Sequence, residues 1–182
     1  MVNTQANPPY PRTHSGACIV AGSAWCLHED LKEAWRLYPD APVIAVNGAA
    51  REVKAFALIS QHPQNFTGAE WIRHQRRLFG GGFTTHAPCQ HPNADYWWNV
   101  RLAGGSAWVA RKIAALMGFQ TVILAGCPMI PGNYANHRPG LLMTKQNIVD
   151  ELLRQIEADN DYHHGCYSMS GRTMEILGSP EC

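Results

Sequence analysis

Charged residues are scarce in this sequence, and neither sign dominates. Only 16% of its 182 residues are charged, and the formal net charge is +1. No large field of one sign is therefore available to hold nucleic acid nonspecifically or to bind an anionic membrane surface. No apolar run approaches the roughly 20 residues that cross a bilayer, and the N-terminus lacks a charged segment followed by an apolar stretch. We therefore predict a cytoplasmic protein with no membrane partner.

Paired metal-binding motifs are also missing. The six cysteines are irregularly spaced without a Cys-x-x-Cys pair, and no His-Glu-x-x-His motif occurs. Several cysteines lie in or beside apolar segments, where a reduced cysteine behaves as a small hydrophobic residue, so we interpret all six as thiols. Zinc remains an alternative, because His86-Ala-Pro-Cys89-Gln-His91 and His163-His164-Gly-Cys166 carry side chains that zinc accepts. Without the paired spacing we assign no metal site.

The sequence does contain enough apolar material for one buried core. Hydrophobic residues make up 46% of the chain, and a length of 182 residues suits a single domain. Residues 1–16 hold three of the twelve prolines and no periodic pattern. We therefore expect an extended N-terminal arm over residues 1–16, followed by one domain over residues 17–182.

Apolar patterning predicts a parallel sheet with helices on both faces. Runs that are apolar at consecutive positions, as in strands covered on both sides, occur at Ala17–Ala21, Val43–Val46, Ala55–Ile59 and Val122–Ala125. Helical faces are formed by Leu27, Leu31, Ala34 and Trp35, by Val109, Ile113, Leu116 and Met117, and by Val149, Leu152, Leu153 and Ile156. This alternation is typical of a doubly wound, mostly parallel α/β fold of the Rossmann-like kind. The Gly/Pro/His-rich stretch Gly80–Asn93 interrupts it, and we predict a lid or pocket-edge insertion there.

Small and polar residues follow the predicted strands. In a parallel sheet, the residues just past each strand meet at one edge. Those residues are Ser23, Asn47, Ser60 with His62, Gly126 with Cys127, and Ser168 with Ser170. In addition, Gly104-Gly105-Ser106 opens a predicted helix whose backbone N–H groups can receive a phosphate. Each residue alone is also an ordinary turn or cap residue, but together they predict a nucleotide pocket.

Three of these segments resemble bacterial sialyltransferases and the related 6-hydroxymethylpterin diphosphokinase-like proteins. Ala21-Gly-Ser-Ala-Trp-Cys-Leu27 is similar to that group's opening Ala-Gly-Asn-Gly-Pro-Ser-Leu, and Asn47 falls where the group has its second-strand asparagine. Ser106, together with Gly118-Phe-Gln-Thr-Val-Ile-Leu-Ala-Gly126, looks like the group's hydroxyl-bearing turn, helix and strand ending in Gly-x-Asp. The resemblance covers residues 17–60 and 103–137.

The resemblance implies a nucleotide site and also two departures from the group. The residues that would contact the nucleotide are Gly22, Ser23, Asn47, Ser106 and Gly126, to which we add Gly105, Cys127 and Tyr134, whose phenol can donate to phosphate. Ser23-Ala24-Trp25 replaces the group's Asn-Gly-Pro, which removes a glycine and adds a bulky ring. Pro128 replaces the acid of Gly-x-Asp, so a carboxylate that could hold a ribose or a metal is missing.

The expected chemistry is metal-independent transfer of a glycosyl or phosphoryl group from a nucleotide or nucleotide-sugar donor. The nucleotide is the substrate, and we assign no cofactor. Such a reaction needs a base that deprotonates the acceptor and donors that stabilise the departing phosphate. His62, just past the third strand, and His137, in the loop after Gly126, are the candidate catalytic bases.

Alternatives from other classes remain open. A noncatalytic nucleotide-binding or sequestering protein would fit Pro128, whereas a pterin diphosphokinase-like enzyme would need magnesium and a carboxylate to hold it. The basic cluster Arg73, Arg76 and Arg77 lies on a predicted helix. It could meet an anionic substrate or a nucleic-acid backbone, although most such helices are simply solvated.

Overall fold

A computed structural model describes residues 2–3, 6–11, 14–66, 70–131, 135 and 146–180. Its centre is an eight-stranded sheet with the order β10-β9-β4-β5-β6-β7-β8-β2, in which every neighbouring pair is parallel except β8 and β2. The strands are β2 (Ala6–Asn7), β4 (Ala17–Ala21), β5 (Val43–Val46), β6 (Ala57–Ile59), β7 (Thr84–Ala87), β8 (Tyr96–Trp98), β9 (Thr121–Ala125) and β10 (Cys166–Ser168). The predicted doubly wound, mostly parallel sheet is confirmed.

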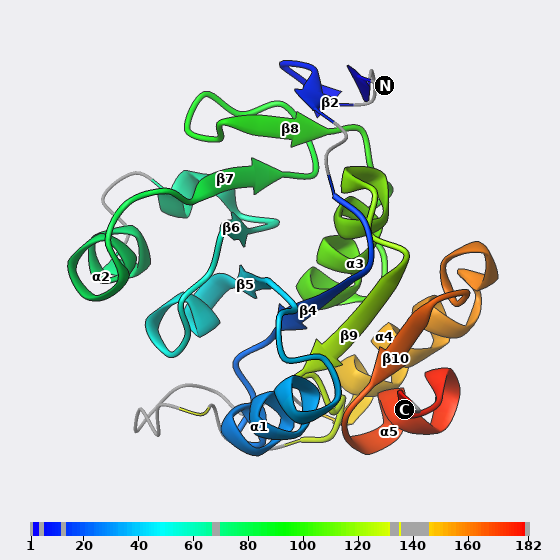
Figure 1. Cartoon of the computed structure of the whole chain (residues 1–182). Helices are drawn as coiled ribbons and strands as arrows, with labels where there is room; N and C mark the ends of the chain where they lie inside the picture. The colour runs from blue at the N-terminus through cyan, green and yellow to red at the C-terminus, as the bar shows by residue number, and fades with distance from the viewer. Residues whose placement is uncertain are drawn as a thin grey trace.

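Helices cover both faces of this sheet. The α-helices are α1 (Leu27–Leu37), α2 (Glu70–Phe79), α3 (Gly105–Met117), α4 (Gln146–Glu157) and α5 (Gly171–Leu177), and 3-10 turns are η1 (Asn47–Arg51), η2 (Pro63–Phe66) and η3 (Asn160–Tyr162). Figure 1 shows α1 and α2 on one side of the sheet and α3 and α4 on the other. No helix in the described part of the chain is long and apolar enough to cross a membrane.

The consecutive apolar positions of the central strands are explained by this double cover. In β4, Cys18 and Val20 pack into the core beneath α3, whereas Ile19 and Ala21 pack into the core beneath α1. Successive side chains of a strand point to opposite faces, so a strand buried on both sides has no polar face. The same reasoning holds for β5, whose four residues are all buried.

The chain reverses its direction of travel across the sheet at β4. It proceeds outward through β5, β6, β7 and β8, and then returns through α3 to place β9 on the other side of β4. The loops after β4 and β9 therefore leave the sheet toward opposite faces. Ligands of open α/β sheets bind in the crevice at such a reversal, beyond the carboxyl ends of the strands.

The stretch predicted as a lid is instead part of the sheet. Residues Thr84–Ala87 form β7, which pairs in parallel with β6, and β8 pairs in parallel with β7. Glycine and proline obscured a short strand that begins with two β-branched threonines, a residue type that suits strands. His86 at its centre is fully buried, accepts a hydrogen bond from Trp98 Nε1 at 3.1 Å and bonds Thr84 Oγ1 at 2.7 Å. Burial lowers its pKa to about 3, which keeps the ring neutral.

The N-terminal segment is also joined to the sheet. Within residues 1–16, β1 (Val2–Asn3) pairs with β3 (Tyr10–Pro11), and β2 adds an antiparallel edge strand beside β8. The buried Tyr10 packs against His86, Tyr96 and Trp98, with ring centroids 4.9–5.6 Å apart. The segment that we expected to be an extended arm thus contributes a strand and an aromatic anchor to the domain.

Helix α3 is buried on almost every side, which its sequence does not suggest. Beyond the predicted apolar face, its neighbouring residues Arg111 and Lys112 are also buried. Lys112 forms an ion pair with Asp159 and bonds the carbonyl of Arg101 at 3.3 Å, and Trp108 Nε1 donates to the same Asp159 carboxylate at 3.0 Å. Arg111 donates to the carbonyl of His164 at 2.7 Å. Buried cations require such partners.

The core face of α1 differs from the prediction at one residue, and α2 packs partly through a polar side chain. On α1, Trp35 is not in the core: it is 37% exposed and its Nε1 donates to the carbonyl of Ala41 at 3.4 Å. On α2, Leu78 is 53% exposed, and the buried residues are Ile72 and Gln75. The Gln75 amide donates to the carbonyls of Ala50 and Val53, so a polar side chain fixes α2 to the loop after β5.

Candidate functional site

A cavity of about 220 Å³ lies at the carboxyl ends of β4, β5 and β9, where the sheet reverses direction. Its walls are the loops that follow these strands, together with the first turn of α3 and one face of α4. Seven of the predicted binding residues line it: Gly22, Ser23, Asn47, Gly105, Ser106, Gly126 and Cys127. The eighth, Tyr134, and the candidate base His137 lie outside the described residues.

The first turn of α3 offers free backbone N–H groups to the cavity. Gly104, the N-cap residue, is left-handed with φ 71°, no described side chain caps the helix, and no acidic residue occupies its first turn. Gly104 itself is bound to α4, because its N–H donates to Gln155 Oε1 at 2.8 Å. Gly105, Ser106 and Ala107 line the cavity. An uncapped N-terminus of a 13-residue helix carries partial positive charge and can receive an anionic oxygen.

Asn47 presents an unsatisfied amide at the same cavity. It follows β5 with a left-handed backbone, φ 50°, and its side-chain oxygen is buried without a hydrogen-bond partner among the described residues. Buried polar atoms are almost always paired, so an orphan atom in a cavity wall suits a ligand that supplies the missing donor. Ser23 lies close to Gly48, the residue after Asn47, because a Cβ built on Gly48 would be 3.8 Å from Ser23 Oγ.

Gly22 and Gly126 bring two strand ends into direct contact. The Gly22 N–H donates to the carbonyl of Ala125 at 2.8 Å, and the Ala24 N–H donates to the carbonyl of Gly126 at 3.1 Å. A Cβ on Gly22 would lie 2.5 Å from both Cys127 Sγ and the Gly126 carbonyl oxygen, and a Cβ on Gly126 would lie 2.6 Å from the Gly22 carbonyl oxygen. The contact between the two loops therefore requires a residue without a side chain at both positions.

A buried carboxylate that the sequence analysis missed stabilises the loop after β9. Asp30 of α1, only 6% exposed, accepts hydrogen bonds from the Gly126 N–H at 2.8 Å and from the Ser170 hydroxyl at 2.7 Å. Ser170 is the N-cap residue of α5, but its hydroxyl makes this bond and no capping bond to the helix. The available signal was the position of Asp30 on the buried face of α1, between Leu27 and Leu31.

Cys127 lines the cavity but is not suited to act as a nucleophile. Its thiol is buried and donates weakly to the carbonyl of Ala125 at 3.4 Å. Burial, followed by the nearby Cys26, raises the pKa of this thiol well above its ordinary value. A neutral thiol is a poor nucleophile.

The remaining strand-end residues lie apart from the cavity. His62 is exposed and does not line it, and its N–H donates to the buried Ser60 hydroxyl at 3.0 Å. Ser168 bonds Thr173 at 2.8 Å and so closes the start of α5. Three of the five predicted strand ends thus meet at the cavity, and the other two support local structure.

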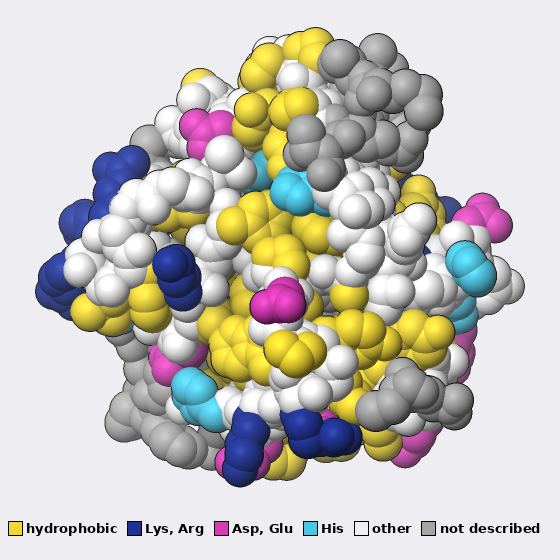
Figure 2. All heavy atoms as spheres, in the orientation of Figure 1, with side chains coloured by type: hydrophobic (Ala, Val, Ile, Leu, Met, Phe, Trp, Pro, Cys, Tyr) yellow, Lys and Arg dark blue, Asp and Glu magenta, His cyan; other side chains and the backbone are white. Residues whose placement is uncertain are grey.

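No Asp, Glu, Lys, Arg or His occurs among the described residues that line the cavity. The one Asp-x-Asp sequence, Asp159-Asn160-Asp161, is elsewhere, with Asp159 paired to Lys112. No group of three or more possible metal ligands occurs within the described residues. The arginines of α2 lie at one side of the molecule, where Figure 2 shows basic side chains gathered over that helix. They do not line this cavity.

Comparisons with known proteins place the fold. No protein-family profile matches the chain, and no curated protein matches it. Among solved structures, the chain is similar to the sialyltransferase CstII from Campylobacter jejuni, determined in complex with a substrate analogue, CMP-3FNeuAc. The TM-score is 0.56 and the sequence identity 15%, over 93% of this chain and 89% of that chain. The chain therefore has a sialyltransferase-like fold.

Proposed function

We propose that the protein is a transferase that takes a glycosyl or phosphoryl group from a nucleotide-linked donor, with a nucleoside monophosphate held in the cavity. The observation that carries this proposal is the convergence of an uncapped helix N-terminus, the orphan amide oxygen of Asn47 and two serine hydroxyls on one cavity at the sheet reversal. Helix N-termini and hydroxyls can bind phosphate without a cation, and on this ground we propose a metal-independent transfer.

The absence of charge in the described lining limits the kind of phosphate that fits. A diphosphate bound through magnesium needs carboxylate or basic side chains around it, and the described lining offers neither. A single phosphate needs only one set of N–H donors. The structural neighbour was determined with a CMP-linked sugar analogue, which is a monophosphate donor. This favours a nucleoside monophosphate sugar over the diphosphokinase alternative.

Replacing Asn47 with alanine tests the binding step. We expect the variant to bind CMP more weakly by about 1–3 kcal/mol, because the donor that the amide oxygen accepts from would lose its partner. Isothermal titration calorimetry measures this directly. Asn99→Ala serves as the control, since Asn99 is exposed and does not line the cavity. Equal affinity of wild type and Asn47→Ala would remove Asn47 from the site.

Trp25 gives a second test of the same site. Its ring lines the cavity and is 54% exposed, so it can stack on the base of the nucleotide. Stacking of a base on an aromatic ring contributes about 1–3 kcal/mol, so Trp25→Ala should weaken CMP binding by that amount. Trp25→Phe should retain most of the affinity. Trp35→Ala is the matched control, because Trp35 is also partly exposed but lies on the outer face of α1.

A noncatalytic nucleotide-binding protein is the second candidate, favoured by one observation. No general base lines the described part of the cavity, since His62 lies outside it and Cys127 is held neutral. Turnover separates the two candidates: release of CMP from a CMP-linked sugar supports the transferase, and tight CMP binding without release supports the binding protein. His137→Ala and His62→Ala, assayed separately, then show whether either histidine acts as the base.

A further inference from the structure

A second cavity of about 520 Å³ lies at the opposite edge of the sheet. Its walls are the segments that lead into β4, β5 and β9, the same three strands whose carboxyl ends form the first cavity. The lining residues that matter here are His14, Tyr38, Asp40 and Phe119. It is therefore distinct from the proposed nucleotide site, and it shares none of its residues.

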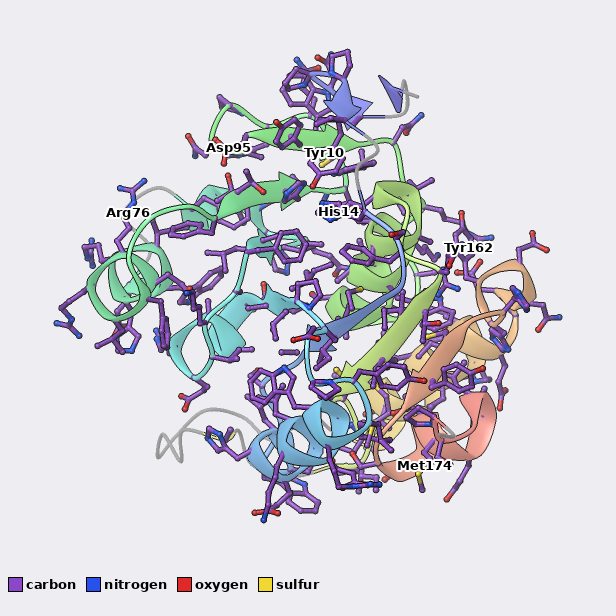
Figure 3. All side chains as sticks on the ribbon, viewed as in Figure 1. Tyr10, His14, Arg76, Asp95, Tyr162 and Met174 are labelled. Atoms are coloured by element: carbon purple, nitrogen blue, oxygen red, sulfur yellow. The ribbon has the colours of Figure 1, made fainter. Side chains whose placement is uncertain are left out.

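The aromatic wall of this cavity is fixed in place. His14 stacks on Phe119 with ring centroids 4.6 Å apart and an interplanar angle of 18°. The Tyr10 hydroxyl bonds His14 Nε2 at 2.7 Å, and Figure 3 shows these two side chains beside one another near the start of β4. His14 also stacks on Tyr10, with ring centroids 5.9 Å apart, and burial lowers the pKa of His14, which favours the neutral ring and so brings no positive charge to this wall.

The electrostatic character of the cavity is negative. Asp40 is exposed at its wall, and its carboxylate has no hydrogen-bond or ion-pair partner among the described residues. Helix α1 ends at Leu37 on the same wall, and the carboxyl end of a helix carries partial negative charge. No Lys or Arg lines the cavity in the described part of the chain. Figure 2 shows hydrophobic side chains across the middle of the face in view and basic side chains toward its left and lower margins.

We propose that this cavity binds a small organic cation with an apolar body, such as a substituted ammonium ion. The half-buried ring of Tyr38 at the cavity wall can attract a cation through its quadrupole, and an unpaired carboxylate with a helix carboxyl terminus stabilises the same charge. An anion of the same size would be repelled by Asp40, and a neutral molecule would gain only the apolar contact. The discriminating property of the ligand is therefore its charge.

Three probes of similar shape test this inference on the full chain: benzyltrimethylammonium, benzyl alcohol and benzoate. Binding is followed by backbone amide shifts in 1H–15N NMR spectra. We expect the ammonium ion to shift amides around Tyr38, Asp40 and Phe119, with a Kd on the order of millimolar. The alcohol should bind more weakly, and benzoate should leave these amides unshifted. Equal binding of benzoate and the ammonium ion, or no shifts with the ammonium ion, would overturn the proposal.

Asp40→Asn identifies the charge that selects the cation. This near-isosteric change should lower the affinity for benzyltrimethylammonium about two- to fivefold, the range expected for a partly solvated ion pair. The affinity for benzyl alcohol should stay the same. Glu175→Gln on α5 is the control, because it removes an exposed carboxylate that does not line the cavity. An unchanged affinity for the cation in Asp40→Asn would refute the role of Asp40 and with it the proposal.

Discussion

Gly126→Ala should destabilise the protein by about 2–5 kcal/mol, the sum of a left-handed backbone penalty and of overpacking. Gly126 has φ 66°, and its new Cβ would lie 2.6 Å from the Gly22 carbonyl oxygen and 2.9 Å from Leu27 Cβ. Neither neighbour is the free end of a flexible side chain, so the two strand ends must separate. Urea denaturation followed by circular dichroism measures the loss.

Gly80→Ala is the matched control for this substitution. Gly80 is also left-handed, with φ 79°, but a Cβ there meets nothing within 4 Å. It should therefore cost only the backbone penalty of about 1–2 kcal/mol. The difference between the two variants isolates the contact between the loops after β4 and β9. If Gly126→Ala were no more destabilising than Gly80→Ala, the claim that these two loops are in close contact would be refuted.

Lys112→Met should cost about 3–5 kcal/mol, because it removes one partner of a buried ion pair and leaves the Asp159 carboxylate uncompensated. Lys112 is 1% exposed and Asp159 only 14% exposed. Methionine has a similar length and preserves most of the packing, so the loss reports the charge and not a cavity. Chemical denaturation measures the free energy of unfolding of Lys112→Met and of the double variant Lys112→Met/Asp159→Asn. Neither charge remains in the double variant, so part of the lost stability should be recovered. Without such recovery, the cost would have to come from packing.

The pair Lys112–Asp159 also predicts how the free energy of unfolding depends on pH. Burial alone would raise the pKa of Asp159, but hydrogen bonds from Lys112 and Trp108 outweigh it, and the pKa lies below its ordinary value. A carboxylate whose pKa is lowered on folding stabilises the protein above the unfolded pKa, near 4. This contribution disappears as the pH falls through the folded pKa. The free energy of unfolding should therefore fall less steeply below about pH 4 in Lys112→Met than in wild type.

Local patterns in the sequence were sufficient for the central sheet. Strands β4 and β5 are continuous apolar runs and β9 is apolar after Thr121, and the residues after the three strands are small or polar, so both the parallel sheet and the meeting of Ser23, Asn47 and Gly126 at one cavity could be predicted. Two physical rules carried this prediction: strands covered on both faces lack a polar side, and parallel strands end at the same edge.

Features that depend on distant partners could not be predicted in this way. The strand Thr84–Ala87 is short and lies between glycine and proline, and only its pairing with β6 makes it a strand. Lys112 resembles an ordinary exposed lysine of a helix, and its burial depends on Asp159, 47 residues later in the chain. Asp30 is similar, because its partners Gly126 and Ser170 belong to other elements. A single sequence gives no signal for such pairs.

The reversal of the sheet at β4 also has a consequence for biosynthesis. A nascent chain can pair β4 with β5 soon after both leave the ribosome, but β9 must still be made before the opposite flank of β4 is filled. Until then β4 remains an unsatisfied edge with an apolar surface, a condition that favours misassociation. The wall formed by Gly126 and Cys127 arrives with β9. A chain truncated before residue 121 would therefore lack Gly126 and Cys127 of the proposed nucleotide site and leave one edge of the apolar strand β4 unpaired.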